Sequence, residues 1–256
     1  MSAGTLQRAR ATGGPAPTRR SRPRRLLRRL GALALLPAFL GVVVVGVGWA
    51  RTPSVEDAAA RVAAQLAENG APPLQVEPAP ALVQALLATE DTGFADHLGV
   101  SATGAVRAFW GLASGTDQGG STLVQQLAKN VYLDGENGPV QKAEAVVLAL
   151  KLDAAYSKDD LLRMYLDNGY YGHGFVGLTE ATEGYFGVPP DQLSWAQATL
   201  LAGLFAAPTA YDPLVHPALA AQRQGHVLGR LVDEGVLGSD EAAEIAADDW
   251  ALVSRP

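Results

Sequence analysis

The sequence has 256 residues and no cysteine, which excludes thiol catalysis, cysteine-ligated metal sites and disulfide bonds. Its length allows one large domain with appendages. The formal net charge of -6 conceals an asymmetry, because residues 1–51 hold about ten Arg and no acid, whereas the rest of the chain carries all 26 acids. A basic tail is typical of nucleic-acid binding, but the segment that follows it indicates a different role.

Residues 30–50 form an uncharged run that could cross a bilayer as a helix, because about 21 residues at 1.5 Å each reach roughly 31 Å. Five Arg lie directly before it, between residues 22 and 29, and the positive-inside rule places that end in the cytoplasm. We therefore predict a disordered cytoplasmic tail (1–29), a single-pass transmembrane helix (30–50) in the cell membrane, an extracytoplasmic domain (53–256) and no nucleic-acid partner. A cleaved signal peptide is the alternative, and it would export the same domain.

The body is predicted to be mainly α-helical. Ser54–Asp57 resembles the capped start of a helix that ends near Asn69-Gly70. The prolines from Pro72 to Pro80 indicate a linker, and residues 82–89 read as an apolar helix. Further helix starts are indicated at Ser157, Ser194, Pro217 and Ser239. Alternating β patterns are scarce, so we expect no large sheet.

A Glu-Asp pair closes the apolar helix, at Glu90 and Asp91. An apolar neighbourhood and an adjacent carboxylate both favour the protonated form of a carboxyl group, which suits a general acid or base. The pair by itself is more typical of a solvated turn. Phe94, His97 and Gly99 follow it at short spacings.

A glycine pair and two hydroxyl residues begin the helix predicted after residue 120. Gln125, Gln126, Lys129 and Asn130 then recur at helical spacing on roughly one face. Backbone amides, hydroxyls and a Lys at a helix start favour binding of a phosphate or a sugar. The alternative is an ordinary capped helix, but the two halves of the pattern together are far more specific than either half.

The two stretches resemble the first two signature motifs of the peptidoglycan glycosyltransferases, the glycosyltransferase 51 family, which supplies the transglycosylase domain of class A penicillin-binding proteins. The family motifs read Glu-Asp-x-x-Phe-x-x-His-x-Gly and Gly-Gly-Ser-Thr-x-x-Gln-Gln-x-x-Lys-Asn, and both are complete here, at 90–99 and 119–130. Shorter matches continue from 148 to 213 and at Arg223. The resemblance implies a monofunctional enzyme with a lysozyme-like, bilobal domain.

The resemblance also implies a substrate, lipid II, which is a disaccharide-peptide on a lipid pyrophosphate. Glu90 would take the proton of the acceptor 4-hydroxyl, whose oxygen then attacks the anomeric carbon of the growing glycan chain with inversion. The departing pyrophosphate needs cations and hydrogen-bond donors. The expected substrate-binding residues are Asp91, Phe94, His97, Arg107, Gly120, Ser121, Thr122, Gln125, Gln126, Lys129, Asn130, Lys142 and Arg223.

The third family motif, Arg-Lys-x-x-Glu, is incomplete. An ungapped alignment places Gln141 at its Arg, Lys142 at its Lys and Ala145 at its Glu, a residue thought to assist the departing pyrophosphate. Glu144 is a second catalytic candidate, but it lies about 100° round the helix and could substitute only if the helix shifts register.

Two further departures lie four residues apart: Arg163 stands where the family usually has Glu, and Asp167 where it usually has Asn. Residues at this spacing lie on one helix face, so the pair predicts a replacement salt bridge.

Two classes of function remain open. The first is an active polymerase in which Glu90 carries the chemistry. The second is a non-catalytic relative that binds lipid II or a cell-wall synthesis partner, because Ala145 replaces the second Glu. A lysozyme-like hydrolase is a weaker third alternative, since the motifs favour an anionic lipid donor.

The motifs also bear on a transpeptidase partner and on metal binding. The chain ends at Pro256 without a Ser-x-x-Lys or Lys-Thr-Gly motif, so crosslinking would require a separate transpeptidase. No His has the spacing of a metal ligand, and no metal ligand is predicted. By the resemblance, a divalent cation (Mg or Mn) could help with the pyrophosphate.

Overall fold

The computed structural model describes residue 1 and residues 46–101, 104, 120–136 and 138–253. It divides the chain into two compact units, Met1–Val47 and Gly48–Pro256. The described residues are helical, and their one extended pairing is an antiparallel bridge between Tyr170 and Val176. The predicted fold class, mainly α without a large sheet, is confirmed for this part of the chain.

The predicted tail (1–29) and transmembrane helix (30–50) lie outside the described residues, except for Met1 and residues 46–50. Among the residues that are described, no helix combines the length and the apolar character that a bilayer crossing requires. The segment that follows, 48–53, is fixed to the body by Lys151, whose amine donates to the carbonyl oxygens of Thr52 (2.8 Å) and Pro53 (3.0 Å).

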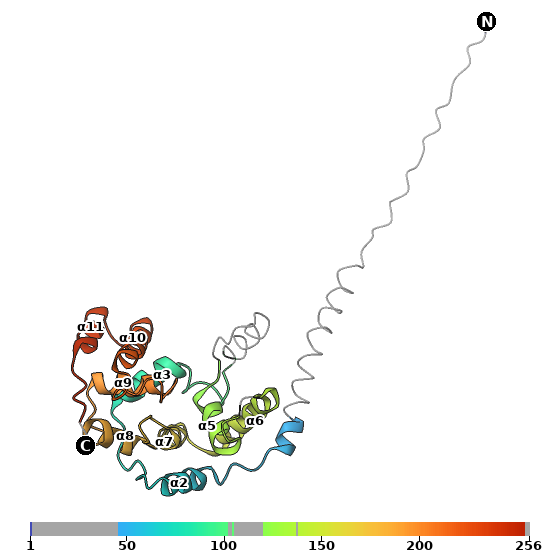
Figure 1. Ribbon diagram of the computed structural model, residues 1–256. Helices are drawn as coiled ribbons and strands as arrows, with labels where there is room; N and C mark the ends of the chain where they lie inside the picture. The colour runs from blue at the N-terminus through green and yellow to red at the C-terminus, as the bar shows by residue number, and fades with distance from the viewer. Residues whose placement is uncertain (2–45, 102–103, 105–119, 137, 254–256) are drawn as a thin grey trace. The chain divides into compact units, whose positions relative to one another are not determined.

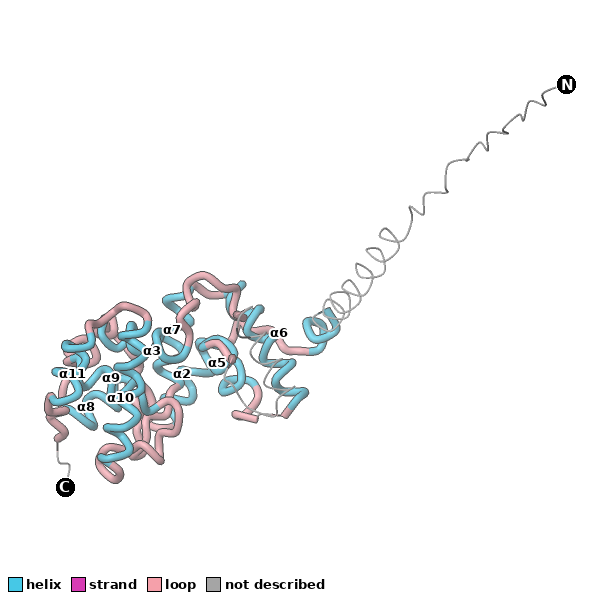
Figure 2. The backbone as a smooth tube through the Cα atoms, turned by 90° about the horizontal axis from the view of Figure 1, so that it is seen from above, coloured by secondary structure: helices cyan, strands magenta, loops and turns pink. Residues whose placement is uncertain are grey.

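Two groups of helices make up the second unit (Figures 1 and 2). The first group contains α3 (Pro80–Glu90), α9 (Trp195–Leu204), α10 (Pro217–Asp233) and α11 (Ser239–Ala247). The second contains α2 (Ala58–Glu68), α5 (Leu123–Tyr132), α6 (Pro139–Ala155) and α7 (Lys158–Asn168), and α8 (Leu178–Phe186) contacts α7. One core cluster of buried side chains extends through both groups.

Local signals explain where several helices begin. Ser157 caps α7 by accepting from the amide of Asp160, and Ser194 forms a capping box with Gln197 at the start of α9, as predicted. Pro80 was predicted to belong to a linker, but it begins α3. Proline fits the first helical turn because the amide it lacks would have no partner there.

Helix α9 is the central helix of the first group. Every residue from Ala196 to Leu204 is buried, which is typical of a helix that other elements surround on all sides. Helices α3, α10 and α11 pack against it. This packing holds the end of α3, which carries Glu90, beside α10.

The predicted salt bridge between Arg163 and Asp167 does not form. Arg163 instead pairs with Glu77 and donates to the carbonyl oxygen of Val76 (3.2 Å), while Asp167 Oδ1 accepts from the amide of Leu74 (3.0 Å). Both side chains therefore hold the linker before α3 against α7. Burial raises the pKa of Asp167 to about 6, against the opposing effects of the Leu74 hydrogen bond and the Arg163 charge.

Candidate active site

Glu90 is the last residue of α3, and its carboxylate lies where three helices meet. Oε2 accepts a hydrogen bond from Gln126 Nε2 of α5 at 3.2 Å. Oε1 accepts one from a terminal nitrogen of Arg223, on α10, at 3.4 Å. The side chain remains 18% exposed. Each oxygen thus has one donor, and the group still reaches the surface of a pocket.

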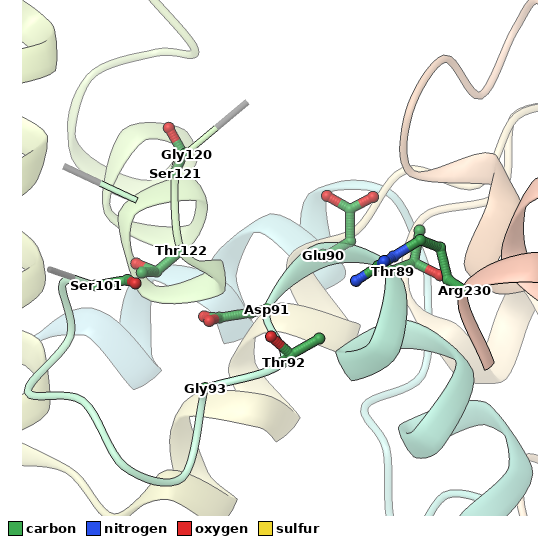
Figure 3. Close-up of a pocket in the computed structure, with 10 residues that line it drawn as sticks. All are labelled: Thr89, Glu90, Asp91, Thr92, Gly93, Ser101, Gly120, Ser121, Thr122 and Arg230. Atoms are coloured by element: carbon green, nitrogen blue, oxygen red, sulfur yellow. The ribbon is translucent and has the colours of Figure 1, made fainter. Parts of the chain in front are cut away.

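The pocket beside Glu90 is polar and has a volume of about 140 Å³. In Figure 3, Glu90 and Arg230 lie on one side, and Ser101 with the start of α5 lies on the other. The lining residues are Thr89, Glu90, Asp91, Thr92, Gly93, Ser101, Gly120, Ser121, Thr122 and Arg230. The first and second sequence motifs therefore face each other across one cavity.

Asp91 connects these two motifs. Its side chain is buried, and Oδ2 accepts from the amide of Leu123, the first residue of α5, at 3.0 Å. His97 Nε2 lies 2.9 Å from both carboxylate oxygens. Because Asp91 directly follows Glu90, these contacts fix the end of α3 to the start of α5, and a negative charge at a helix N-terminus is favourable.

The start of α5 already uses most of its own donors. Thr122 and Gln125 form a reciprocal capping box, and the Thr122 hydroxyl donates to the carbonyl oxygen of Gly99 at 2.6 Å. With Leu123 bound to Asp91, three amides of this turn have side-chain partners. An anion at this helix start would have to use Ser121, which is exposed, and nearby cations rather than these amides.

Two glycines of the motifs are required by close approaches of the backbone. A Cβ on Gly120 would lie 2.6 Å from the carbonyl oxygen of Gly104. Gly99 has a φ of +76°, and a Cβ there would lie 2.4 Å from the carbonyl oxygen of Ala149. Gly120 therefore lets the second motif approach the backbone at Gly104, and Gly99 lets its own segment approach α6.

The other predicted site residues have varied positions. Phe94 is buried in the core, beneath the Lys158 amine, which lies 4.9 Å from its ring centre. Lys129 is half-buried and Asn130 exposed on α5, and neither side chain has a hydrogen bond or ion pair with another described residue. Arg107 lies outside the described residues. For all of these, a role in substrate binding stays a prediction.

The incomplete third motif lies at the start of α6. Ala145 belongs to the buried stripe that continues through Leu148, Ala149 and Leu152. Lys142 is exposed, and Glu144 lies on the adjoining, half-exposed side of the helix. Helix α6 is continuous from Pro139 to Ala155, and Glu144 and Ala145 lie on different sides of it; a catalytic role of Glu144 stays a prediction.

Sequence reasoning missed two residues. Arg230 lines the pocket and donates to the carbonyl oxygen of Ala88 at 3.2 Å. It follows Arg223 by seven residues, so the two-turn spacing on α10 could have indicated it. Tyr165 donates to Gln126 Oε1 at 3.0 Å, and only the tertiary structure shows this contact.

The face of α10 that borders the pocket is basic. Burial and the charges of Arg223 and Arg230 lower the pKa of His226, which lies between them in the sequence. Among the described residues, no group of three or more His, Asp or Glu side chains is arranged to hold a metal ion.

Comparisons with known proteins show the family of this chain. A family model described as transglycosylase matches residues 61–232. Penicillin-binding protein 1F of Bacillus subtilis is 38% identical over 62% of this chain and 22% of its own length. A Cupriavidus necator protein named as a transglycosylase is 37% identical over 62% of this chain and 70% of its own length. A crystal structure of penicillin-binding protein 1A from Haemophilus influenzae matches 38% of this chain and 14% of its own, with 26% identity and a TM-score of 0.36.

The chain thus spans about a fifth of the length of the Bacillus penicillin-binding protein, and most of the length of the Cupriavidus relative. The family model matches more than half of the chain and includes Glu90, Gln126 and Arg223. The chain belongs to the transglycosylase family, the glycosyltransferase 51 domain of class A penicillin-binding proteins.

Proposed function

We propose that this protein is a peptidoglycan glycosyltransferase that polymerises lipid II into β-1,4-linked glycan strands and releases lipid pyrophosphate. The observation that carries the proposal is the position of Glu90. Its carboxylate opens onto a polar pocket while donors from α5 and α10 hold one oxygen each. A fixed, partly exposed carboxylate is what a general base for a sugar hydroxyl requires.

In the reaction, Glu90 accepts the proton of the acceptor 4-hydroxyl. The resulting oxygen forms a bond to the anomeric carbon of the growing chain, the bond from that carbon to the pyrophosphate breaks, and the configuration inverts. Gln126 and Arg223 keep the carboxylate oriented by binding it from two sides. A base held in place lowers the entropic cost of reaching the transition state.

The departing pyrophosphate needs positive charge in a body that is otherwise acidic. Lys129 lies one helical turn beyond Gln126 on α5, and its amine has no ion pair with another described residue, so it is available to a phosphate. Arg230 is a second cation for this role, because it lines the pocket beside Glu90. A divalent cation (Mg or Mn) that helps with the pyrophosphate stays a prediction.

The proposal includes the shape of the domain and its place at the membrane. The two helix groups would correspond to the lobes of a lysozyme-like domain, with Glu90 between them. Residues 30–50 would anchor the protein in the cell membrane with its N-terminus in the cytoplasm, which places the catalytic domain outside, next to lipid-linked substrate. A separate transpeptidase or another cell-wall synthesis protein would be its partner.

One observation favours a second candidate, a protein that binds lipid II or a cell-wall synthesis partner without turnover. The position of the second family Glu is filled by Ala145, whose buried place offers no carboxylate, and Glu144 lies on a different side of α6. If that acid were indispensable, the site would bind lipid II without transferring the sugar.

Polymerisation of labelled lipid II by the purified full-length protein in detergent separates the two candidates. The proposal predicts glycan polymer with the wild type. Binding of lipid II without any polymer would instead support the binding protein. Glu144→Gln is a suitable companion variant, because it changes a nearby carboxyl group that the proposal leaves without a role.

A further inference from the structure

Two buried tyrosines pack on the same phenylalanine, and their hydroxyls have different partners. The ring centres of Tyr165 and Tyr171 each lie 5.0 Å from that of Phe205. Tyr171 donates to the carbonyl oxygen of Leu166 at 3.1 Å, a contact within the local chain. Tyr165 donates to Gln126 Oε1 at 3.0 Å, and Gln126 contacts Glu90. Only one of the two tyrosines is thus linked to the proposed base.

The link has a direction because the side-chain amide of Gln126 has a donor end and an acceptor end. An ionised Glu90 only accepts hydrogen bonds, so it must face Nε2, and Oε1 must then face Tyr165. The hydroxyl of Tyr165 completes this order by donating to Oε1. Without that hydroxyl, Oε1 would lose its donor, and the side-chain amide would keep only its hydrogen bond to Glu90.

We propose that Tyr165 is a positioning residue for the glycosyl transfer, because its hydroxyl holds the amide of Gln126 in the place from which Nε2 donates to Glu90. This inference rests on the proposed function. Tyr165 does not line the pocket and acts only through Gln126. The order of contacts runs from Tyr165 on α7 through Gln126 on α5 to Glu90 on α3.

Burial suits Tyr165 to this role. Its side chain is almost fully buried, and the stacked ring of Phe205 restricts its movement. Burial, followed by the nearby charge of Glu90, raises the pKa of Tyr165 well above its usual value, so the hydroxyl keeps its proton and stays a donor.

The test begins with Tyr165→Phe, which removes the hydroxyl and keeps the ring that packs on Phe205. We expect kcat for lipid II polymerisation to fall roughly tenfold, well short of the 10²–10⁴-fold contributed by a general base itself. The acidic limb of the pH–rate profile should move to higher pH, because loss of a hydrogen-bond donor makes the ionised form of a carboxyl group less favourable.

Tyr171→Phe is the matched control. It removes a hydroxyl of the same kind from the same packing on Phe205, but the hydrogen bond that it breaks ends at Leu166. This variant should leave the acidic limb at the wild-type pH. An equal movement of the limb in both variants would show a general effect of lost packing and would overturn the proposal.

A double-mutant cycle with Gln126→Met shows whether Tyr165 acts through Gln126. The Tyr165→Phe effect should nearly vanish in the Gln126→Met background, and an undiminished effect there would overturn the proposal. Titration of the Glu90 carboxyl by carbon-13 NMR is the readout independent of turnover. Its midpoint should move to higher pH in Tyr165→Phe and not in Tyr171→Phe, and an unmoved midpoint would reject the inference.

The same series separates this inference from the proposed function. An inactive wild type, or an active Glu90→Gln, would contradict the proposed function, whereas the NMR midpoints would still decide whether Tyr165 controls the environment of Glu90. An active wild type with an unchanged Tyr165→Phe profile would contradict the inference alone.

Discussion

The end of α3 and the start of α6 both carry motif residues, but the two regions differ in how those residues are held. At the end of α3, Glu90 and Asp91 have partners on α5 and α10 and in the loop that contains His97. At the start of α6, Lys142 and Glu144 have no side-chain hydrogen bond or ion pair with another described residue.

The comparison shows where a substitution affects stability as well as chemistry. A change at the end of α3 breaks contacts between helices, because the same side chains hold the helices together and form the site. A change at the start of α6 breaks no such contact. The exchange of the second family Glu for Ala145 is therefore compatible with an unchanged network around Glu90.

Asp91→Ala should have the largest effect on stability. It leaves the Leu123 amide and the His97 ring nitrogen without their partner, and we expect the free energy of unfolding to fall by about 2–4 kcal/mol. Urea unfolding followed by circular dichroism measures the change. Asp96→Ala, at an exposed neighbouring position, should stay within about 0.5 kcal/mol. Similar losses in both variants would show that the buried contacts of Asp91 add no particular stability to the end of α3.

Asp167→Asn should have a smaller effect of the opposite sign. The raised pKa, about 6, means that the folded state binds the proton more tightly than the unfolded state. The stability that Asp167 contributes is therefore complete below about pH 4 and is lost as the pH rises through 6. Asn keeps the acceptor for the Leu74 amide without the charge, so the variant should be about 1–2 kcal/mol more stable at pH 7.5.

Unfolding curves of wild type and Asp167→Asn between pH 4 and pH 7.5 test this sign. The difference should grow with pH and approach zero at the acidic end. The exposed Asp191→Asn is the control and should show no such trend. A variant that is less stable than the wild type at pH 7.5 would show that the charge of Asp167 is favourable in its place beside α7.

Glu144→Ala should have the smallest effect. Glu144 lies outside the stripe of Ala145, so its loss should change the polymerisation rate by about twofold or less, equivalent to roughly 0.5 kcal/mol. Initial rates with labelled lipid II provide the measurement. A loss of tenfold or more would mean that Glu144 replaces the missing acid and that the start of α6 takes part in the chemistry.

Much of the helical framework could be predicted from the sequence because capping and periodicity are local. Ser157 and Ser194 begin α7 and α9 as predicted. Pro80 was assigned wrongly because proline marks both linkers and first helical turns. Arg163 and Asp167 have the spacing of a helical salt bridge, yet tertiary packing places a linker within reach of both, and each binds it instead.

The motifs predicted which residues lie together at the site. They did not predict which of these residues bind one another instead of facing the pocket. Glu90 and Gln126 come together as the motifs implied. Thr122 and Gln125, expected to bind substrate, cap α5, and Asp91 binds the first amide of that helix. Tyr165 could not have been found, because its link to Glu90 depends on three helices that are distant in the sequence.

The most direct test of the account is the rate of polymer formation by Glu90→Gln, measured on protein that binds lipid II and unfolds at the wild-type temperature. Gln preserves the size of the side chain and removes its basicity. The account predicts a loss of at least about 100-fold. A variant that keeps more than about a tenth of the wild-type rate would contradict the assignment of Glu90 as the base.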